Sequence, residues 1–105
     1  MVDKQSDYPV RLSGKERQIL QLLVSNGEMY GLQMVHASEG QLARGTVYVV
    51  LDRMQDKGLV ETRVEENSSV SGLPRRLYRP TGYGVKVFRQ WERLQALAVF
   101  APELR

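Results

Sequence analysis

The sequence predicts a mainly helical α+β domain, in which three helices precede a two-stranded β-hairpin and a fourth helix follows it. Two patterns lead to this fold class. Apolar residues recur at helical spacing before residue 58 and after residue 81, whereas residues 59–64 are rich in β-branched side chains. The length of 105 residues and the 42% of hydrophobic residues suit one compact core. We therefore expect one folded domain.

A flexible arm is predicted over residues 1–11, and the first helix over residues 13–25. The arm is polar and contains a proline, which interrupts regular structure. Ser13 and Glu16 have the Ser-x-x-Glu spacing of a capping box, in which each side chain bonds the backbone N–H of the other residue. Gly27 is expected to end the helix, because glycine readily takes the left-handed conformation found at helix C-termini.

Two further helices are predicted before the hairpin. The second begins near Leu32 and ends near Gly40, while residues 29–31 form a segment too short to assign. The third helix begins near Arg44 and ends at Gly58, since a glycine after a basic residue is typical of a helix end. The spacing of three, four and three predicts one buried face, and its residues are Val47, Val50, Leu51 and Met54.

The hairpin is predicted from residues 59–64 and 77–79, which a polar segment containing glycine separates. It completes a folded domain over residues 12–80. We expect Glu65 and Glu66 to oppose the basic residues of the hairpin.

Two adjacent arginines of the hairpin are candidate DNA contacts. Alternation along the strand sends Arg76 to one face and Arg75 and Arg79 to the other. We predict that Arg75 and Arg76 contact DNA. The alternative is a solvated sheet edge, where charged side chains prevent aggregation.

Residues 81–105 are predicted to form a C-terminal dimerisation helix with Thr81 as its cap. The apolar residues at heptad spacing, from which we expect the dimer interface, are Val87, Trp91, Leu94, Ala98 and Ala101. Val85 and Phe88 lie off this seam, so we expect them to pack on their own domain. An exposed apolar stripe of this length is unusual in a soluble monomer, which favours a homodimer.

This order of elements is that of a winged helix-turn-helix domain, in which one helix enters the major groove of DNA and the hairpin flanks it. At the start of the third helix, Arg44 is placed to reach a phosphate or a guanine edge, and Val49 to meet a thymine methyl group. Gly45 either lets backbone N–H groups approach a phosphate or is a simple turn residue. The candidate DNA-binding residues are Arg44, Gly45, Thr46, Tyr48, Val49, Arg53, Arg75 and Arg76. The alternative for the arginines of this helix is a solvated surface.

Composition narrows the classes of function. A net charge of +3 permits nucleic-acid binding without requiring it. The absence of cysteine excludes disulfides, thiolate metal sites and cysteine nucleophiles, and His36 is the single histidine, so we expect no metal or cofactor. The sequence has no catalytic motif, signal peptide or apolar span, so we expect a soluble cytoplasmic protein that is not an enzyme.

Several short motifs lie between residues 12 and 100. They are Tyr30-Gly31, Gly45-Thr46-Val47-Tyr48, Leu51, Gly58-Leu59, and Pro74-Arg75-Arg76-Leu77-Tyr78 followed by Thr81 and Gly84. In combination they resemble the PadR-like family of transcription regulators, in its compact subgroup with one C-terminal helix. The resemblance implies a dimeric repressor that reads a pseudo-palindromic operator with its third helix and pairs through its C-terminal helix.

The resemblance also implies release by an aromatic small-molecule effector, with Trp91 near the aromatic residue that lines the effector cavity. The alternative for Trp91 is packing in the dimer core. Ala43 and Arg44 stand where the family has a serine and a proline, and Pro80 replaces a leucine, so the preferred DNA sequence is expected to differ. Two other functions stay open: a winged-helix module that binds another protein, and a sensor whose main event is ligand capture at Trp91.

Overall fold

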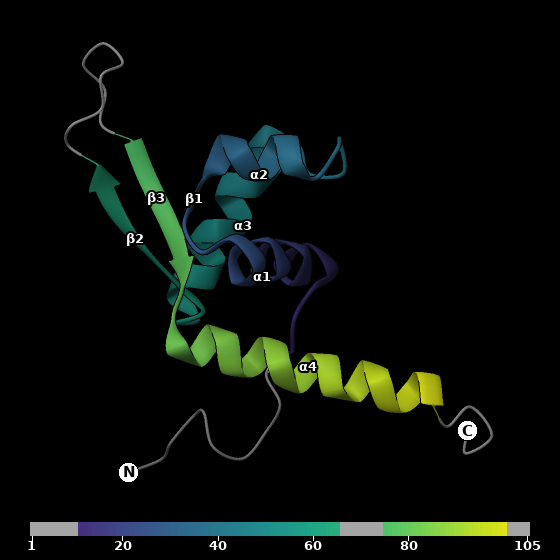
Figure 1. Cartoon of the computed structure of the whole chain (residues 1–105). Coiled ribbons are helices and arrows are strands. Elements are labelled where there is room, and N and C mark those ends of the chain that lie inside the picture. The colour runs from purple at the N-terminus through teal and green to yellow at the C-terminus, as the bar shows by residue number, and fades with distance from the viewer. Residues whose placement is uncertain (1–10, 66–74, 101–105) are drawn as a thin grey trace.

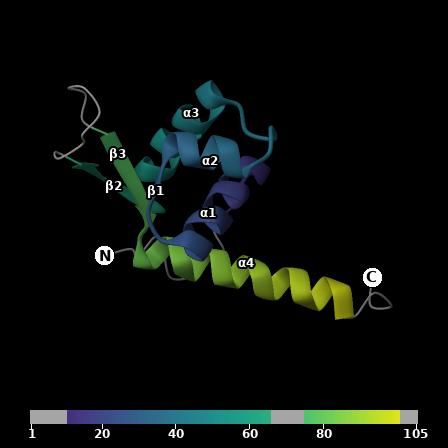
Figure 2. The same cartoon turned by 45° about the horizontal axis from the view of Figure 1, so that its top comes forward.

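The computed structural model describes residues 11–65 and 75–100, with side chains as far as Leu97. Helices α1 to α3 gather beside a small sheet, and α4 runs along α1 and extends past it, as Figure 1 and Figure 2 show. The elements in chain order are α1 Gly14–Asn26, β1 Met29–Tyr30, α2 Gly31–Ala37, α3 Arg44–Asp56, β2 Val60–Glu65, β3 Arg75–Pro80 and α4 Gly82–Phe100. This arrangement confirms the predicted winged-helix fold class.

The sheet has three antiparallel strands in the order β1-β3-β2, whereas a two-stranded hairpin was expected. The added strand is β1, whose Met29 pairs with Tyr78 and whose Tyr30 pairs with Leu77. Two residues carry no alternation of polar and apolar side chains, so the local sequence could not reveal this strand. It forms because β3, about fifty residues later in the chain, offers its free edge to β1.

The predicted helix caps are confirmed. The hydroxyl of Ser13 accepts the N–H of Glu16 at 3.1 Å, and the Glu16 carboxylate accepts the N–H of Ser13 at 2.9 Å. Gly27 ends α1 with a φ of 90°. At the start of α4, the hydroxyl of Thr81 accepts the N–H of Gly84 at 2.9 Å. These bonds satisfy backbone groups that a helix end leaves unpaired.

The core lies between α1, α2, α3 and the inner face of the sheet. The four residues predicted as the buried face of α3 are all in it, and Val50, the most exposed of them, is 4% exposed. The other core residues include Ile19, Leu20, Leu23, Met34, Leu42, Leu59, Val60 and Tyr78. Because α3 fills the core with this face, its opposite face is left at the surface.

The first turns of α4 also belong to the core, which corrects one assignment. Val87 was expected at the dimer interface, but it is 3% exposed and packs in the core of its own chain beside Phe88. Heptad spacing predicts an apolar seam on a helix, but it does not show which partner packs against that seam. Here the first turns of the seam pack against the same chain. Leu94 is 54% exposed. Ala101 and the side chain of Ala98 lie outside the part that the structure describes.

The start of α4 is held tightly against the start of β2. Gly84 is buried, and a Cβ atom there would lie 2.1 Å from the backbone oxygen of Leu59. The N–H of Thr81 donates to the same oxygen at 3.0 Å, and the Thr81 hydroxyl donates to the Gly58 oxygen at 2.6 Å. Residue 84 must therefore be glycine for α4 to leave the sheet in this direction.

Candidate nucleic-acid interface

The surface of α3 divides into three sides. One side packs into the core, Tyr48 lies on the side next to the sheet, and the exposed residues Gly45, Val49 and Arg53 line a groove between α3 and α1. Val49 is 59% exposed, which is high for a large apolar side chain. Helix α3 therefore presents an exposed apolar residue, Val49, with the basic Arg53 on the α1 side and the acidic Asp52 on the sheet side.

The start of α3 is open. Its N-cap residue, Ala43, provides no side-chain hydrogen bond, so the first N–H groups of the helix lack a side-chain partner there. Arg44 and Gly45 are exposed, and a Cβ atom at Gly45 would meet nothing within 4 Å. Packing within the chain therefore does not require glycine at this position.

Tyr48 packs across α2 instead of pointing straight outward. A Cβ atom at Gly31 would lie 2.7 Å from the Tyr48 ring, so the ring covers this buried glycine. Burial raises the pKa of the Tyr78 hydroxyl; Arg76 acts to lower it, and Tyr48 and Asp52 act to raise it. These residues therefore surround Tyr78 where α3 meets the sheet, and Arg76 lies on the α3 side.

Arg75 and Arg76 lie on opposite faces of the sheet. The guanidinium of Arg75 lies 4.7 Å from the centre of the Tyr30 ring, and the Tyr30 hydroxyl bonds the Glu65 carboxylate. Both partners are on the outer face, away from α3. Arg75 is thus engaged within the sheet, whereas Arg76 borders the exposed side of α3.

Two other arginines of the hairpin are neutralised by carboxylates that the sequence analysis missed. Arg63 makes a two-bond contact with Glu28, at 2.8 and 3.0 Å, and this contact lowers the pKa of Glu28. Arg79 bonds Glu61 at 2.8 Å. The expected acidic neighbours were Glu65 and a residue outside the described part, Glu66. The positive charge of the wing is therefore smaller than a count of its arginines indicates.

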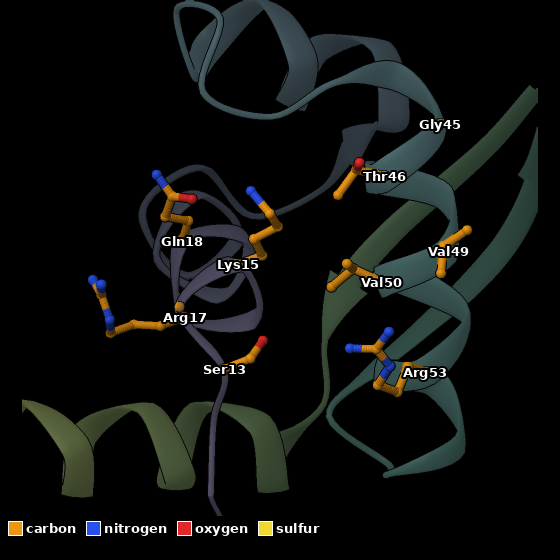
Figure 3. A pocket seen from close by; sticks show the side chains of 10 residues that line it. Ser13, Lys15, Arg17, Gln18, Gly45, Thr46, Val49, Val50 and Arg53 are labelled. Atoms are coloured by element: carbon orange, nitrogen blue, oxygen red, sulfur yellow. The ribbon is translucent and has the colours of Figure 1, made fainter.

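A groove separates the start of α1 from α3, and Figure 3 shows its lining side chains. Its volume is about 1040 Å³, and its residues are Ser13, Gly14, Lys15, Arg17, Gln18, Gly45, Thr46, Val49, Val50 and Arg53. Lys15 and Gln18 were not predicted as site residues. Their sequence shows only that they belong to the first turns of α1, and their nearness to α3 depends on how the two helices pack.

An ion pair between the buried Glu16 and the partly exposed Lys57 joins the groove walls. Glu16 has no exposed surface and binds the ammonium of Lys57 at 2.8 Å. Burial alone would raise the pKa of Glu16, but hydrogen bonds from Lys57 and Ser13 outweigh it and hold that pKa below its ordinary value. The ion pair connects the first turn of α1 to the residue that ends α3.

Trp91 lies where α4 passes α1. The guanidinium of Arg17 is 4.6 Å from the centre of the Trp91 ring, and the Phe88 ring centre is 6.5 Å away. Trp91 is partly buried in this position. Among the described residues there is no cluster of three or more potential metal ligands, and no helix in this part of the chain is long and apolar enough to cross a membrane.

Three helices, a small antiparallel wing and an exposed third helix define the winged helix-turn-helix class. Residues 19–90 match the model of the transcriptional regulator PadR-like family, so the chain belongs to this family. The family consists of transcription regulators and not of enzymes. A search of the curated proteins found no significant match.

Solved structures with the same fold come from several bacteria. Bacillus subtilis PadR, solved in complex with operator DNA, has a TM-score of 0.66 and 22% identity over 77% of this chain and 48% of its own. A PadR family transcriptional regulator from Eggerthella lenta has a TM-score of 0.66 and 24% identity over 86% and 82%. A mutant of ZitR from Lactococcus lactis has a TM-score of 0.71 and 17% identity over 96% and 63%. The present chain thus spans about half the length of the Bacillus subtilis protein.

Proposed function

We propose that this chain is a cytoplasmic repressor that binds duplex DNA as a homodimer, with α3 in the major groove of each half of a pseudo-palindromic operator. One observation carries the proposal: the start of α3 is exposed and uncapped, and an arginine of the wing, Arg76, lies on the α3 side of the sheet. The Bacillus subtilis relative solved with operator DNA supports it by analogy.

The outward face of α3 suits base edges. Val49 offers an apolar surface for a thymine methyl group, and Arg44 has a donor group for a guanine edge or a phosphate. Gly45 lets the first N–H groups of the helix approach a phosphate closely. Tyr48 contributes less than the sequence indicates, because its ring is occupied by packing over Gly31.

The two adjacent wing arginines allow a matched test. Replacing Arg76 with glutamine should weaken binding to all duplexes about tenfold and lower the slope of log affinity against log salt by about 0.9, because one phosphate contact is lost. Replacing Arg75 removes the same charge from the outer face and should change both quantities much less. The measurement is fluorescence anisotropy over a salt series, with a duplex selected from random DNA.

The same experiment also distinguishes DNA binding from the main alternative, which is a winged-helix module that binds another protein. If the wild-type chain binds no duplex after selection from random DNA, the function as a DNA-binding repressor is rejected and a winged-helix module for protein binding is favoured. Equal losses for Arg75→Gln and Arg76→Gln would contradict the division of the two arginines between opposite faces.

The homodimer is proposed to form through α4. Leu94 is 54% exposed and Leu97 is 65% exposed in the single chain, so the second half of α4 carries apolar surface that its own domain does not cover. A second copy would bury this surface. Trp91 joins it at the margin with the domain, and the proposed interface is therefore Trp91, Leu94, Leu97 and Ala98.

We propose that an aromatic effector, where one acts, binds at Trp91. The stack of Arg17 on the Trp91 ring supports this, because it shows that one face of the ring accepts a flat cationic group. A flat ligand would use the other ring face or displace Arg17. Either event would disturb the contact between α1 and α4.

A further inference from the structure

A helix that lies in the major groove has a phosphate backbone on each side. The groove is about 12 Å wide and a helix with its side chains is about 10–12 Å across, so both backbones come close to the protein. The sheet side of α3 offers Arg76 to one of them. The opposite side of α3 borders the groove that it forms with α1, and this groove is open to the same ligand.

The α1–α3 groove has basic groups but no acidic ones among its ten lining residues. In Figure 3, Lys15 extends from α1 across the groove from Thr46, and the guanidinium of Arg53 reaches from α3 toward Ser13. Both Lys15 and Arg53 are exposed. Arg17 points away from the groove and stacks on Trp91, so Lys15 and Arg53 are the two cations directed at the space between the helices.

The carboxylate of Glu16, which lies near Arg53, is already paired with another cation. Glu16 is completely buried beneath the start of α1, and its oxygens bond the ammonium of Lys57 at 2.8 and 3.0 Å. The hydroxyl of Thr46, at the mouth of the groove, adds a neutral donor. An elongated ligand with repeated negative charge fits this combination of open shape, two cations and hydroxyl groups.

We propose that Lys15 and Arg53 bind the sugar–phosphate backbone that lies on the α1 side of the major groove while α3 faces the bases. The proposal rests on the function proposed above and extends the DNA interface onto α1. The protein then holds the duplex from both sides of α3, with Arg76 on one backbone and the α1–α3 groove on the other. These contacts position the helix without reading sequence.

The test compares two double variants that each remove two positive charges. Lys15→Gln with Arg53→Gln alters the groove, whereas Lys86→Gln with Arg89→Gln alters exposed residues of α4. The groove variant should lower the salt slope by about 1.8 and weaken binding about 10- to 100-fold at 0.1 M salt, equally for a selected and an unrelated duplex. The α4 variant should keep a slope close to that of the wild type.

Each outcome has a definite meaning. If the wild type binds duplex DNA and the groove variant keeps its affinity and slope, the groove makes no backbone contact and the inference is wrong, while the proposed function stands. Loss of binding to the selected duplex alone would also overturn it, because base reading would be the cause. If the wild type binds neither duplex, the proposed function itself fails.

The variants must be shown to be folded, which circular dichroism and thermal unfolding establish. Arg53 lies near Glu16 and helps to lower its pKa, so the double variant has some risk of instability. In that case Lys15→Gln alone provides the test, with an expected slope change of about 0.9, and Lys15→Arg should restore the wild-type slope because it restores the charge.

Discussion

Glu16 has no exposed surface, although carboxylates are seldom fully buried. Its burial is tolerated because both carboxylate oxygens have partners. One accepts the N–H of Ser13, and the other binds the ammonium of Lys57. One side chain thus caps α1 and fixes the end of α3. It also connects the two helices that form the α1–α3 groove.

Replacing Glu16 with glutamine should lower the free energy of unfolding by about 2 kcal/mol at pH 7, because it leaves Lys57 without its charged partner. Urea unfolding followed by circular dichroism measures this. Glu92→Gln on the exposed surface of α4 is the control, and it should change stability by less than about 0.5 kcal/mol.

The stabilisation lost in Glu16→Gln should also depend on pH. The pKa of Glu16 is lower in the folded chain than its ordinary value of 4.5, so the ionised carboxylate stabilises the fold above that pH. This stabilisation is lost as the pH falls through the lowered pKa. The difference in stability between wild type and Glu16→Gln should therefore shrink below pH 4.5. A difference that stays constant down to pH 3 would contradict the role of the ion pair.

Single residues were predictable from sequence where their contacts are local. The capping box of Ser13 and Glu16 and the divergence of Arg75 from Arg76 follow from spacing within a few residues. The partner of Arg63 was not predictable, because Glu28 lies 35 positions earlier in the chain. The position of Lys15 was missed for the same reason: only the packing of α1 on α3 places it in the α1–α3 groove.

Among the elements, α4 is positioned in part by one very close backbone contact. At Gly84 an added methyl group would overlap the backbone of Leu59, which cannot move without shifting β2. Gly84→Ala should destabilise the chain by about 3 kcal/mol through overpacking. Thermal unfolding is the measurement.

Gly82→Ala is the matched control, since a Cβ atom at Gly82 meets nothing within 4 Å and alanine is the better helix former. It should leave stability unchanged or raise it slightly. Equal behaviour of the two variants would show that the close approach at Gly84 does not constrain α4.

Elements with strong periodicity were predicted within a few residues, because helical spacing and caps are encoded in the segment itself. Strand β1 was missed, since its two residues are ordered by pairing with β3. Val87 was assigned to the wrong partner, although its burial was correctly expected. An apolar stripe on a helix indicates that something covers it, and only the tertiary structure shows that the early part of α4 is covered by its own domain.

At the scale of the whole molecule, the exposed half of α4 makes a prediction about assembly. Leu94→Asp places a charge in the proposed interface and should shift the protein toward monomer, because a buried unpaired charge is costly. Sedimentation velocity measures the shift. Gln95→Asp, at the next exposed position, adds the same charge beside the seam and should change association less. An intact dimer of Leu94→Asp would contradict the assigned interface.

Thr81 is the one residue between the last strand and α4, and both its N–H and its hydroxyl are bonded to the end of the α3–β2 connection. The winged-helix domain and α4 are therefore joined without a flexible linker. In the proposed dimer, the spacing of about 34–36 Å between recognition helices is then fixed by the α4 pair. Such a dimer cannot adjust to half-sites rotated out of phase, so its affinity should depend on the torsional state of the DNA. If the proposed function holds, supercoiling of the DNA would therefore change how fully the operator is occupied.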